Sequence, residues 1–556
     1  MPMRIWGLLL VALSQALVVS PAQAEDADSA TTRERLELGR RMYMEGVLPS
    51  GELMTATMAG DIPVTGEQLI CGACHRRSGL GSSEGQEVVP AITGELLYKP
   101  LRLPTSKPPL SPEQRPAYTD ASLKTAIRDG VGAGGEPLGV FMPRYAMADE
   151  ELQILLDYLK SLPTYTAPGV TDQEIHFATV VSDGVSSATR KAMEDVMRTF
   201  LVQKNTETRN ESQRAAHAPW HKEWMFQPYR KWVLHVWELR GAQQSWSDQL
   251  RAYYREQPVF AVLNGVVAGS WAPVHDFCEA ERVPCLFPTT DLPVVNEADF
   301  YSLYLSQGMT LEAGAIEHHL ASDGGATQAV VQVLRAGDPR SAAAAQALQS
   351  LGGGVEGRVE NVVLETDQPA DDAFWKRMID AADGKTLIVW LGAAELESFW
   401  TVASASKRRH RIYLSTSLFN SDDYSGIPVA LREQLYFVHP YELPDKLTRL
   451  LARSTGWFRA KRIYAPDERE VQANAYFSLK MAGGALKHIR GFFNREYFIE
   501  RIEHMVDNAS YTSVYPRISL APSQRFVSKG CYIAQLEGGE KAHLRAISEW
   551  LIPGAG

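Results

Sequence analysis

Apolar residues in the last two thirds of the chain alternate between short strand-like runs and longer runs with helical spacing. The expected strands and helices are Ile175–Val181, Ala188–Val202, Lys231–Leu239, Trp246–Tyr254, Val259–Leu263, Ala329–Leu334, Ser341–Leu351, Thr386–Leu391 and Arg411–Leu414. Such alternation predicts parallel α/β sheets with helices on both faces. About 370 residues are too many for one doubly wound sheet, so the pattern predicts two lobes.

The first third of the chain has a different pattern, with two well-marked helices. Residues 32–43 place Leu36, Gly39 and Tyr43 on one face, and residues 149–159 carry an apolar stripe after an acidic first turn. Residues 164–172 are rich in Pro, Gly and Thr without periodicity, which is typical of a linker. We therefore expect a small domain at 31–163 and a larger domain at 173–545.

The N-terminus has the features of a signal peptide. Arg4 precedes a largely apolar run, and Ala22-Gln23-Ala24 gives a small-x-small cleavage pattern. We expect residues 1–24 to be removed and the mature protein to be exported to the periplasm, because no later apolar run has membrane-spanning length. The net charge of −10 argues against a nucleic-acid partner.

The sequence Cys71-Gly72-Ala73-Cys74-His75 carries the most specific chemistry. Five cysteines are present, and an odd count leaves one unpaired in an oxidising compartment unless thiols are otherwise consumed. A zinc site would need a second ligand pair, and the next cysteine, Cys278, lies 204 residues after Cys74. A thioredoxin-like dithiol would follow a strand, whereas a turn-rich segment precedes Cys71. In an exported protein, Cys-x-x-Cys-His is the signature of covalent c-type haem attachment.

With this motif and the two flanking helices, residues 31–163 resemble a class I cytochrome c, an all-α domain around one haem. The resemblance implies covalent attachment through Cys71 and Cys74, with His75 and Met142 as the axial iron ligands. It also implies that the carbonyl of Pro90 orients His75, that both axial sites are filled, and that the domain exchanges electrons with a redox partner in the periplasm. Met147 lacks the adjacent proline that Met142 has. The segment Gly46–Leu69 is longer than such cytochromes usually have, and its methionines have no predicted role.

The larger part resembles the type I periplasmic binding proteins of the branched-chain amino-acid and amide-binding class. The resemblance is carried by Pro258–Gly265 and by Val283–Pro288, a strand opened by Val-Pro. It implies a two-lobed α/β domain whose ligand lies at the carboxyl ends of strands. The implied binding residues are Ser270 and Trp271 in one loop, and Thr289 and Thr290 in the next.

Several alternatives stay open. Cys278 and Cys285 are either a disulfide or two buried thiols. The large domain is a ligand-binding or partner-docking module, a solute-binding component of an uptake or sensing system with a permease partner, or a substrate-holding part of a haem oxidoreductase. The enzyme hypothesis is the weakest, because no phosphate loop, Gly-x-Ser-x-Gly or His-Glu-x-x-His motif is present.

Overall fold

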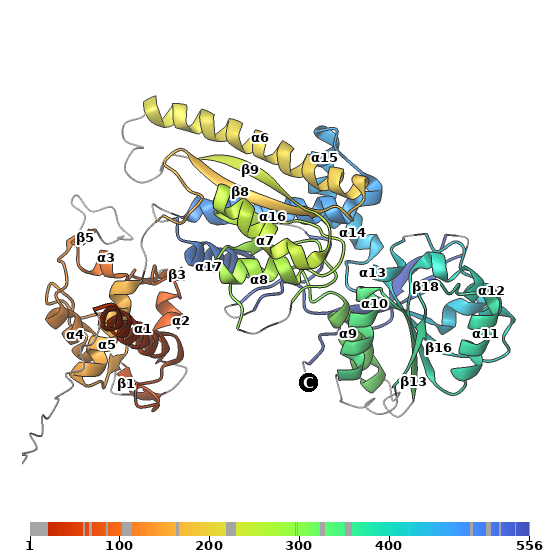
Figure 1. The fold of residues 1–556 in the computed structure, drawn as a ribbon, viewed down its shortest axis with the longest axis horizontal. Helices are drawn as coiled ribbons and strands as arrows, with labels where there is room; N and C mark the ends of the chain where they lie inside the picture. The colour runs from red at the N-terminus through yellow and green to blue at the C-terminus, as the bar shows by residue number, and fades with distance from the viewer. Residues whose placement is uncertain are drawn as a thin grey trace, which may run out of the picture. The chain divides into compact units, whose positions relative to one another are not determined.

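The computed structural model describes residues 21–58, 62–65, 69–84, 87–102, 114–162, 166–217, 230–294, 296, 298–322, 329–350, 359–421, 423–489, 493–506, 513–521, 524–539 and 541–554. The chain divides into two compact units, Met1–Thr164 and Tyr165–Gly556 (Figure 1). Residues 1–20 of the predicted signal peptide lie outside the described part. Among the described helices, none is both long and apolar enough to cross a membrane.

The first unit is built around two helices that cross closely. Its helices are α1 (Pro21–Glu45), α2 (Cys71–His75), α3 (Gly94–Leu97), α4 (Asp120–Asp129) and α5 (Asp149–Ser161). A Cβ atom on Gly39 of α1 would lie 2.5 Å from the Cβ atom of Tyr158 and 2.8 Å from the carbonyl oxygen of Ile154, both on α5. The absence of a side chain at Gly39 therefore permits this close helix crossing. Buried Tyr43, Leu152 and Leu155 belong to the core of the unit.

The first unit is not all-α, and this corrects the predicted fold class. Its short strands are β1 (Thr55–Met58), β2 (Ile62–Thr65), β3 (Ser82–Glu84), β4 (Glu87–Val89), β5 (Leu101–Arg102), β6 (Gln114–Arg115) and β7 (Arg144–Tyr145). The long Gly46–Leu69 segment supplies β1 and β2, which pair antiparallel, and β1 also pairs with β7. The segment with no predicted role is thus part of a three-stranded sheet.

The first lobe of the second unit is a parallel sheet in the order β12-β11-β10-β8-β9. Its strands are β8 (Glu174–Ser182), β9 (Lys231–Leu239), β10 (Ala261–Leu263), β11 (Cys285–Leu286) and β12 (Ser302–Leu303). Associated helices are α6 (Ser187–His217), α7 (Trp246–Glu256), α8 (Ala272–Ala280), α14 (Pro444–Leu450), α15 (Ala452–Ala460), α16 (Arg469–His488) and α17 (Arg495–Val506) (Figure 1). The buried residues of β10 explain its uninterrupted apolar sequence, because both faces of a parallel sheet are covered.

The second lobe repeats this strand order. Its sheet runs β14-β13-β15-β16-β17-β18-β19, parallel from β13 to β17 and antiparallel for the last two strands. The strands are β13 (Val330–Arg335), β14 (Val359–Leu364), β15 (Thr386–Trp390), β16 (Arg411–Ser415), β17 (Leu435–His439), β18 (Tyr532–Glu537) and β19 (His543–Ala546). The helices are α9 (Met309–Ser322), α10 (Pro339–Ser350), α11 (Asp372–Ala381), α12 (Glu397–Ala405) and α13 (Thr416–Phe419). The two-lobed α/β prediction is confirmed.

The chain passes between the lobes three times: from β12 to α9, from β17 to α14, and from α17 to β18. We call these three connecting segments the passages, and they are hydrogen-bonded to one another. The Tyr304 amide donates to the Arg525 carbonyl at 2.8 Å, and the Val527 amide donates to the Tyr304 carbonyl at 3.1 Å. The Glu442 amide donates to the Val514 carbonyl at 2.9 Å. Each passage is therefore fixed to another by backbone bonds.

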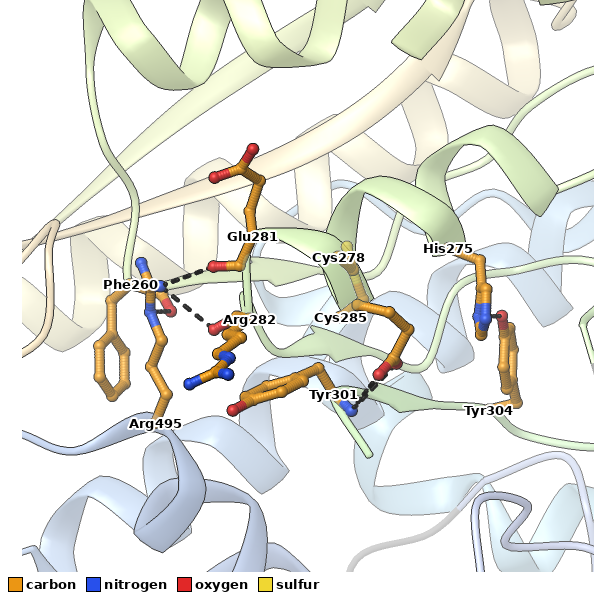
Figure 2. Close-up of a disulfide and its surroundings, with 10 residues drawn as sticks. Phe260, His275, Cys278, Glu281, Arg282, Cys285, Tyr301, Tyr304 and Arg495 are labelled. Carbon is orange, nitrogen blue, oxygen red and sulfur yellow. Dashed lines mark hydrogen bonds between the residues drawn. A yellow bond between two sulfur atoms is a disulfide. The ribbon is translucent and has the colours of Figure 1, made fainter. Parts of the chain in front are cut away.

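A disulfide and an arginine hold the first lobe together beside β11. Cys278 of α8 and Cys285 of β11 form a disulfide with their Cα atoms 6.2 Å apart, which resolves the open alternative (Figure 2). Arg495, at the start of α17, is 6% exposed. Its guanidinium donates to the carbonyls of Pro168, Val259, Phe260, Glu281 and Arg282, and to the Tyr254 hydroxyl. One side chain thus ties α17 to several segments of the lobe.

We expect Arg495→Met to destabilise the second unit by about 3 kcal/mol or more, because several buried carbonyls would lose their donor. Tryptophan fluorescence during urea unfolding measures this unit selectively, since every tryptophan except Trp6 lies after residue 219. The exposed Arg545→Met serves as the control, with an expected change within about 0.5 kcal/mol. Equal midpoints for the two variants would contradict a structural role for Arg495.

Candidate functional site

The predicted haem-attachment residues lie on one short helix, α2. The hairpin of β3 and β4 that follows brings the chain back next to this helix. Cys71 and Cys74 are one turn apart, and His75 ends the helix with 7% of its surface exposed. Strands β3 and β4 pair Ser82 with Val89, so the residue after β4, Pro90, comes back beside the histidine. The Nδ1 atom of His75 lies 2.9 Å from the Pro90 carbonyl oxygen. The structure thus brings His75 and Pro90 together.

Glycine is required at residue 81 for this approach. Gly81 has φ +76°, and its amide donates to the His75 carbonyl at 3.1 Å. A Cβ atom on Gly81 would lie 2.1 Å from the Val89 carbonyl oxygen and 2.9 Å from the Pro90 carbonyl oxygen. Any side chain at this position would therefore displace the carbonyl that accepts from His75.

The ionisation of His75 is set by its surroundings. Burial lowers the pKa of His75, and the bond to the Pro90 carbonyl opposes this only in part. The ring is thus held neutral, which is the form that binds a metal. With Nδ1 donating to Pro90, the other ring nitrogen, Nε2, is left without a hydrogen-bond partner among the described residues.

The two thiols are free and differ in environment. Cys71 is half-buried and Cys74 is exposed. Burial raises the pKa of the Cys71 thiol to about 11, and the Tyr145 hydroxyl, 3.7 Å from the sulfur atom, lowers it in part. A redox dithiol needs a thiol with a lowered pKa, because the thiolate is the nucleophile. The environment of Cys71 is the opposite of what thioredoxin-like chemistry requires.

The loop that carries Met142 is anchored on both sides. Arg144 donates to the carbonyls of Met142 and Leu138, and the guanidinium lies directly over Gly130 at the end of α4. The next residues form β7, which pairs with β1 of the long insertion. Met142 itself is half-buried at the edge of the core, whereas Met147 is 6% exposed and packed within it. Met147 thus has the environment of a core residue.

The predicted ligand-binding residues of the second unit lie after strands of the first lobe. Thr289 donates its amide to the Gly265 carbonyl, and the Thr290 hydroxyl accepts from the Leu292 amide. The Ser270 hydroxyl accepts from the Ala272 amide at the start of α8. Trp271 is 0% exposed and packs in the core against Gly265. A side chain without exposed surface does not contact a solute in this conformation, so Trp271 has a packing role.

Sequence reasoning missed the acidic and aromatic residues that gather between the lobes. These are Asp291, Glu312, Glu470, Tyr441 and Tyr515, which come from five separate segments. Asp291 directly follows the predicted Thr289-Thr290 loop. The rule that ligands lie at the carboxyl ends of strands could therefore have identified it as well. A second available signal was Glu312, the first of two carboxylates in the apolar helix α9 and buried there.

Comparison with known proteins gives structural likeness only. No family model matches the chain, and no curated protein matches it. Among solved structures, a fatty acid ABC transporter substrate-binding protein from Thermomonospora curvata is 13% identical, with a TM-score of 0.46, and the match covers 70% of this chain and 95% of that one. A putative branched-chain amino acid ABC transporter from Rhodospirillum rubrum is 14% identical, with a TM-score of 0.45 and coverages of 67% and 99%. A leucine-binding protein from Thermotoga maritima is 12% identical, with a TM-score of 0.43 and coverages of 67% and 98%.

Proposed function

We propose that this chain is an exported electron-transfer protein, in which residues 31–163 carry one covalent haem c and residues 173–545 bind a small solute. The observation that carries the haem assignment is the buried His75 ring, whose Nδ1 is bonded to Pro90 beside two free thiols on the same helix. Two cysteines one turn apart, an anchored methionine loop, and a neutral histidine whose Nε2 has no hydrogen-bond partner among the described residues fit that cofactor.

Each residue has a distinct role in this proposal. Cys71 and Cys74 would hold the haem covalently, and His75 and Met142 would be its axial ligands. The Pro90 carbonyl fixes the His75 ring and would raise the basicity of Nε2, the nitrogen left to bind iron. When bound, the haem supplies a one-electron iron couple, and a histidine–methionine pair raises its reduction potential. The Arg144 bonds restrict where the Met142 loop can move.

Solute binding by the second unit is supported by its own topology. Both lobes have the strand order 2-1-3-4-5 in their parallel part, and ligands of such sheets lie outside the carboxyl ends of the strands. The three hydrogen-bonded passages give the lobes a defined hinge. We propose a second function on this basis, as the solute-binding component of an uptake or sensing system with a permease. Native mass measurement of freshly purified protein tests it by detecting a retained ligand.

The purified protein is expected to have the mass of a chain beginning at Glu25 plus one haem. The colour should stay with the protein in acidic acetone, because thioether bonds survive extraction. A pyridine haemochrome spectrum checks the attachment, and the Cys71→Ala, Cys74→Ala double variant should yield colourless protein. Colour that moves into the acetone would disprove covalent attachment.

Replacement of Met142 by leucine should remove the sulfur ligand while keeping the side-chain volume. We expect loss of the weak sulfur-to-iron absorption band and a lower reduction potential, because the thioether favours the reduced iron. Met147→Leu is the matched control and should leave both unchanged, since Met147 is a core residue. The reverse result would assign the sixth ligand to Met147.

Gly81→Ala should raise the reduction potential of the haem. The new Cβ atom would displace the Pro90 carbonyl, so His75 would lose its acceptor and become a weaker electron donor. Gly135→Ala is the control, because Gly135 also has positive φ, at +87°, yet its Cβ would meet no atom within 4 Å. Redox titration of both variants checks this, and equal potentials would exclude a role for the His75–Pro90 bond.

A further inference from the structure

Three carboxyl groups from distant parts of the chain approach one another between the lobes of the second unit. Asp291 follows β11 in the first lobe, Glu312 lies in α9, and Glu470 lies at the start of α16. Burial, and then the nearby charge of Asp291, raises the pKa of Glu470 to about 7. Burial raises the pKa of Glu312 to about 8, and the charges of Asp291 and Glu470 contribute to the shift. The three groups therefore form one electrostatic cluster.

An independent observation is that one oxygen atom of this cluster lacks a hydrogen-bond donor. Glu312 is 1% exposed, and its Oε2 atom has no hydrogen-bond donor among the described residues. Hydrogen bonds from the hydroxyls of Ser415 and Ser417 to this carboxyl group lower its pKa in part. A buried carboxylate oxygen without a donor is unfavourable, and a ligand that brings an N–H group would satisfy it.

Two tyrosine rings contact each other next to the carboxyl groups of this cluster. The ring centroids of Tyr441 and Tyr515 are 5.2 Å apart, and the Tyr441 hydroxyl lies 3.2 Å from the Ser417 hydroxyl. Burial, and then the charge of Glu470, raises the pKa of both tyrosines, so their hydroxyls stay neutral. Carboxylates combined with aromatic faces are the typical surroundings of a bound organic cation.

The charge balance of the cluster favours a cation over an anion. The guanidinium of Arg340 pairs with Asp291, its Nη1 atom 3.6 Å from Asp291 Oδ2, and the charge of Arg469 lowers the pKa of Glu470 in part. That leaves Glu312 and Glu470 without an ion pair of this kind among the described residues. Within the described part of the chain, no group of three His, Cys, Asp or Glu side chains is arranged to hold a metal ion.

We infer that the space between the lobes binds a small organic cation, with its charged nitrogen held by Glu312 and Glu470 beside Tyr441 and Tyr515. This inference rests on the proposed solute-binding function and names its ligand class. Ser306, Tyr441 and Tyr515 lie on the three passages between the lobes, so closure of the hinge would change the fit around the nitrogen.

Binding of a cation should release protons. Near neutral pH the carboxyl groups are partly protonated, and a positive ligand favours their ionised form. Affinity should therefore rise with pH between about 6 and 8, the range set by the pKa values of Glu470 and Glu312. The other titratable or charged groups that act on this cluster are Asp291, Asp338, Arg340, Arg469, Tyr441, Tyr515 and Cys531.

The test uses the full-length protein, freed of ligand, and three probes of matched length: 1,4-diaminobutane, 1,4-butanediol and succinate. Calorimetric titration at pH 7 in two buffers of different ionisation enthalpy measures affinity and proton release together. We expect the diamine alone to bind, with proton release. Glu312→Gln and Glu470→Gln should each weaken binding about tenfold or more and reduce the number of protons released. The exposed Glu433→Gln should behave like the unmodified protein.

Three outcomes would overturn the inference. Failure of the diamine to bind, or binding that Glu312→Gln and Glu470→Gln leave unchanged, would exclude this site for a cation. Binding of succinate or butanediol that these variants alter would refute the ligand class while supporting the proposed solute-binding function. The two proposals therefore fail separately, and thermal melting of each variant confirms that it is folded.

Discussion

The three passages between the lobes are the constraint on which the second unit depends. They are tied together by backbone hydrogen bonds, such as those that Tyr304 makes with Arg525 and Val527. Because the chain leaves and re-enters each lobe, neither lobe is a continuous segment of sequence. Along the sequence, helices α16 and α17 of the first lobe come after five strands of the second lobe, β13 to β17. Residues separated by more than two hundred positions are thereby placed in one interlobe space.

This topology explains what the sequence could and could not predict. Strand β15 is a buried apolar run, and its boundaries follow from local pattern. The attachment motif and Pro90 are also local, because a single hairpin joins them. Asp291 and Glu312 each have a local signal, but nothing in the sequence groups them with Glu470, since the cluster exists only after the lobes assemble. The strands of the first unit were missed because they contain only two to four residues each, too few for a clear alternating pattern.

Trp271 shows why a loop position does not define a binding residue. The loop follows the predicted strand and lies where a ligand contact was expected, yet the indole is entirely buried. Gly265 makes room for it, since a Cβ atom there would lie 2.8 Å from the indole Cη2 atom. The bulky residue and the glycine compensate each other in the core. Its smaller neighbour Ser270 is half-buried, and its hydroxyl accepts from the start of α8.

Desolvation is the largest cause of the pKa shifts at both sites, with different consequences. At His75 it lowers the pKa and keeps the ring neutral, while at Cys71 it raises the pKa and keeps the thiol protonated. At Glu312 and Glu470 it raises carboxyl pKa values above those of the unfolded chain. Such a raised pKa contributes stability at low pH, and this contribution is lost as pH rises through 7 and 8. Ionisation of Glu312 and Glu470 therefore destabilises the folded second unit near neutral pH. A cation between the lobes would remove that penalty, so ligand binding and lobe closure would be coupled through the same charges.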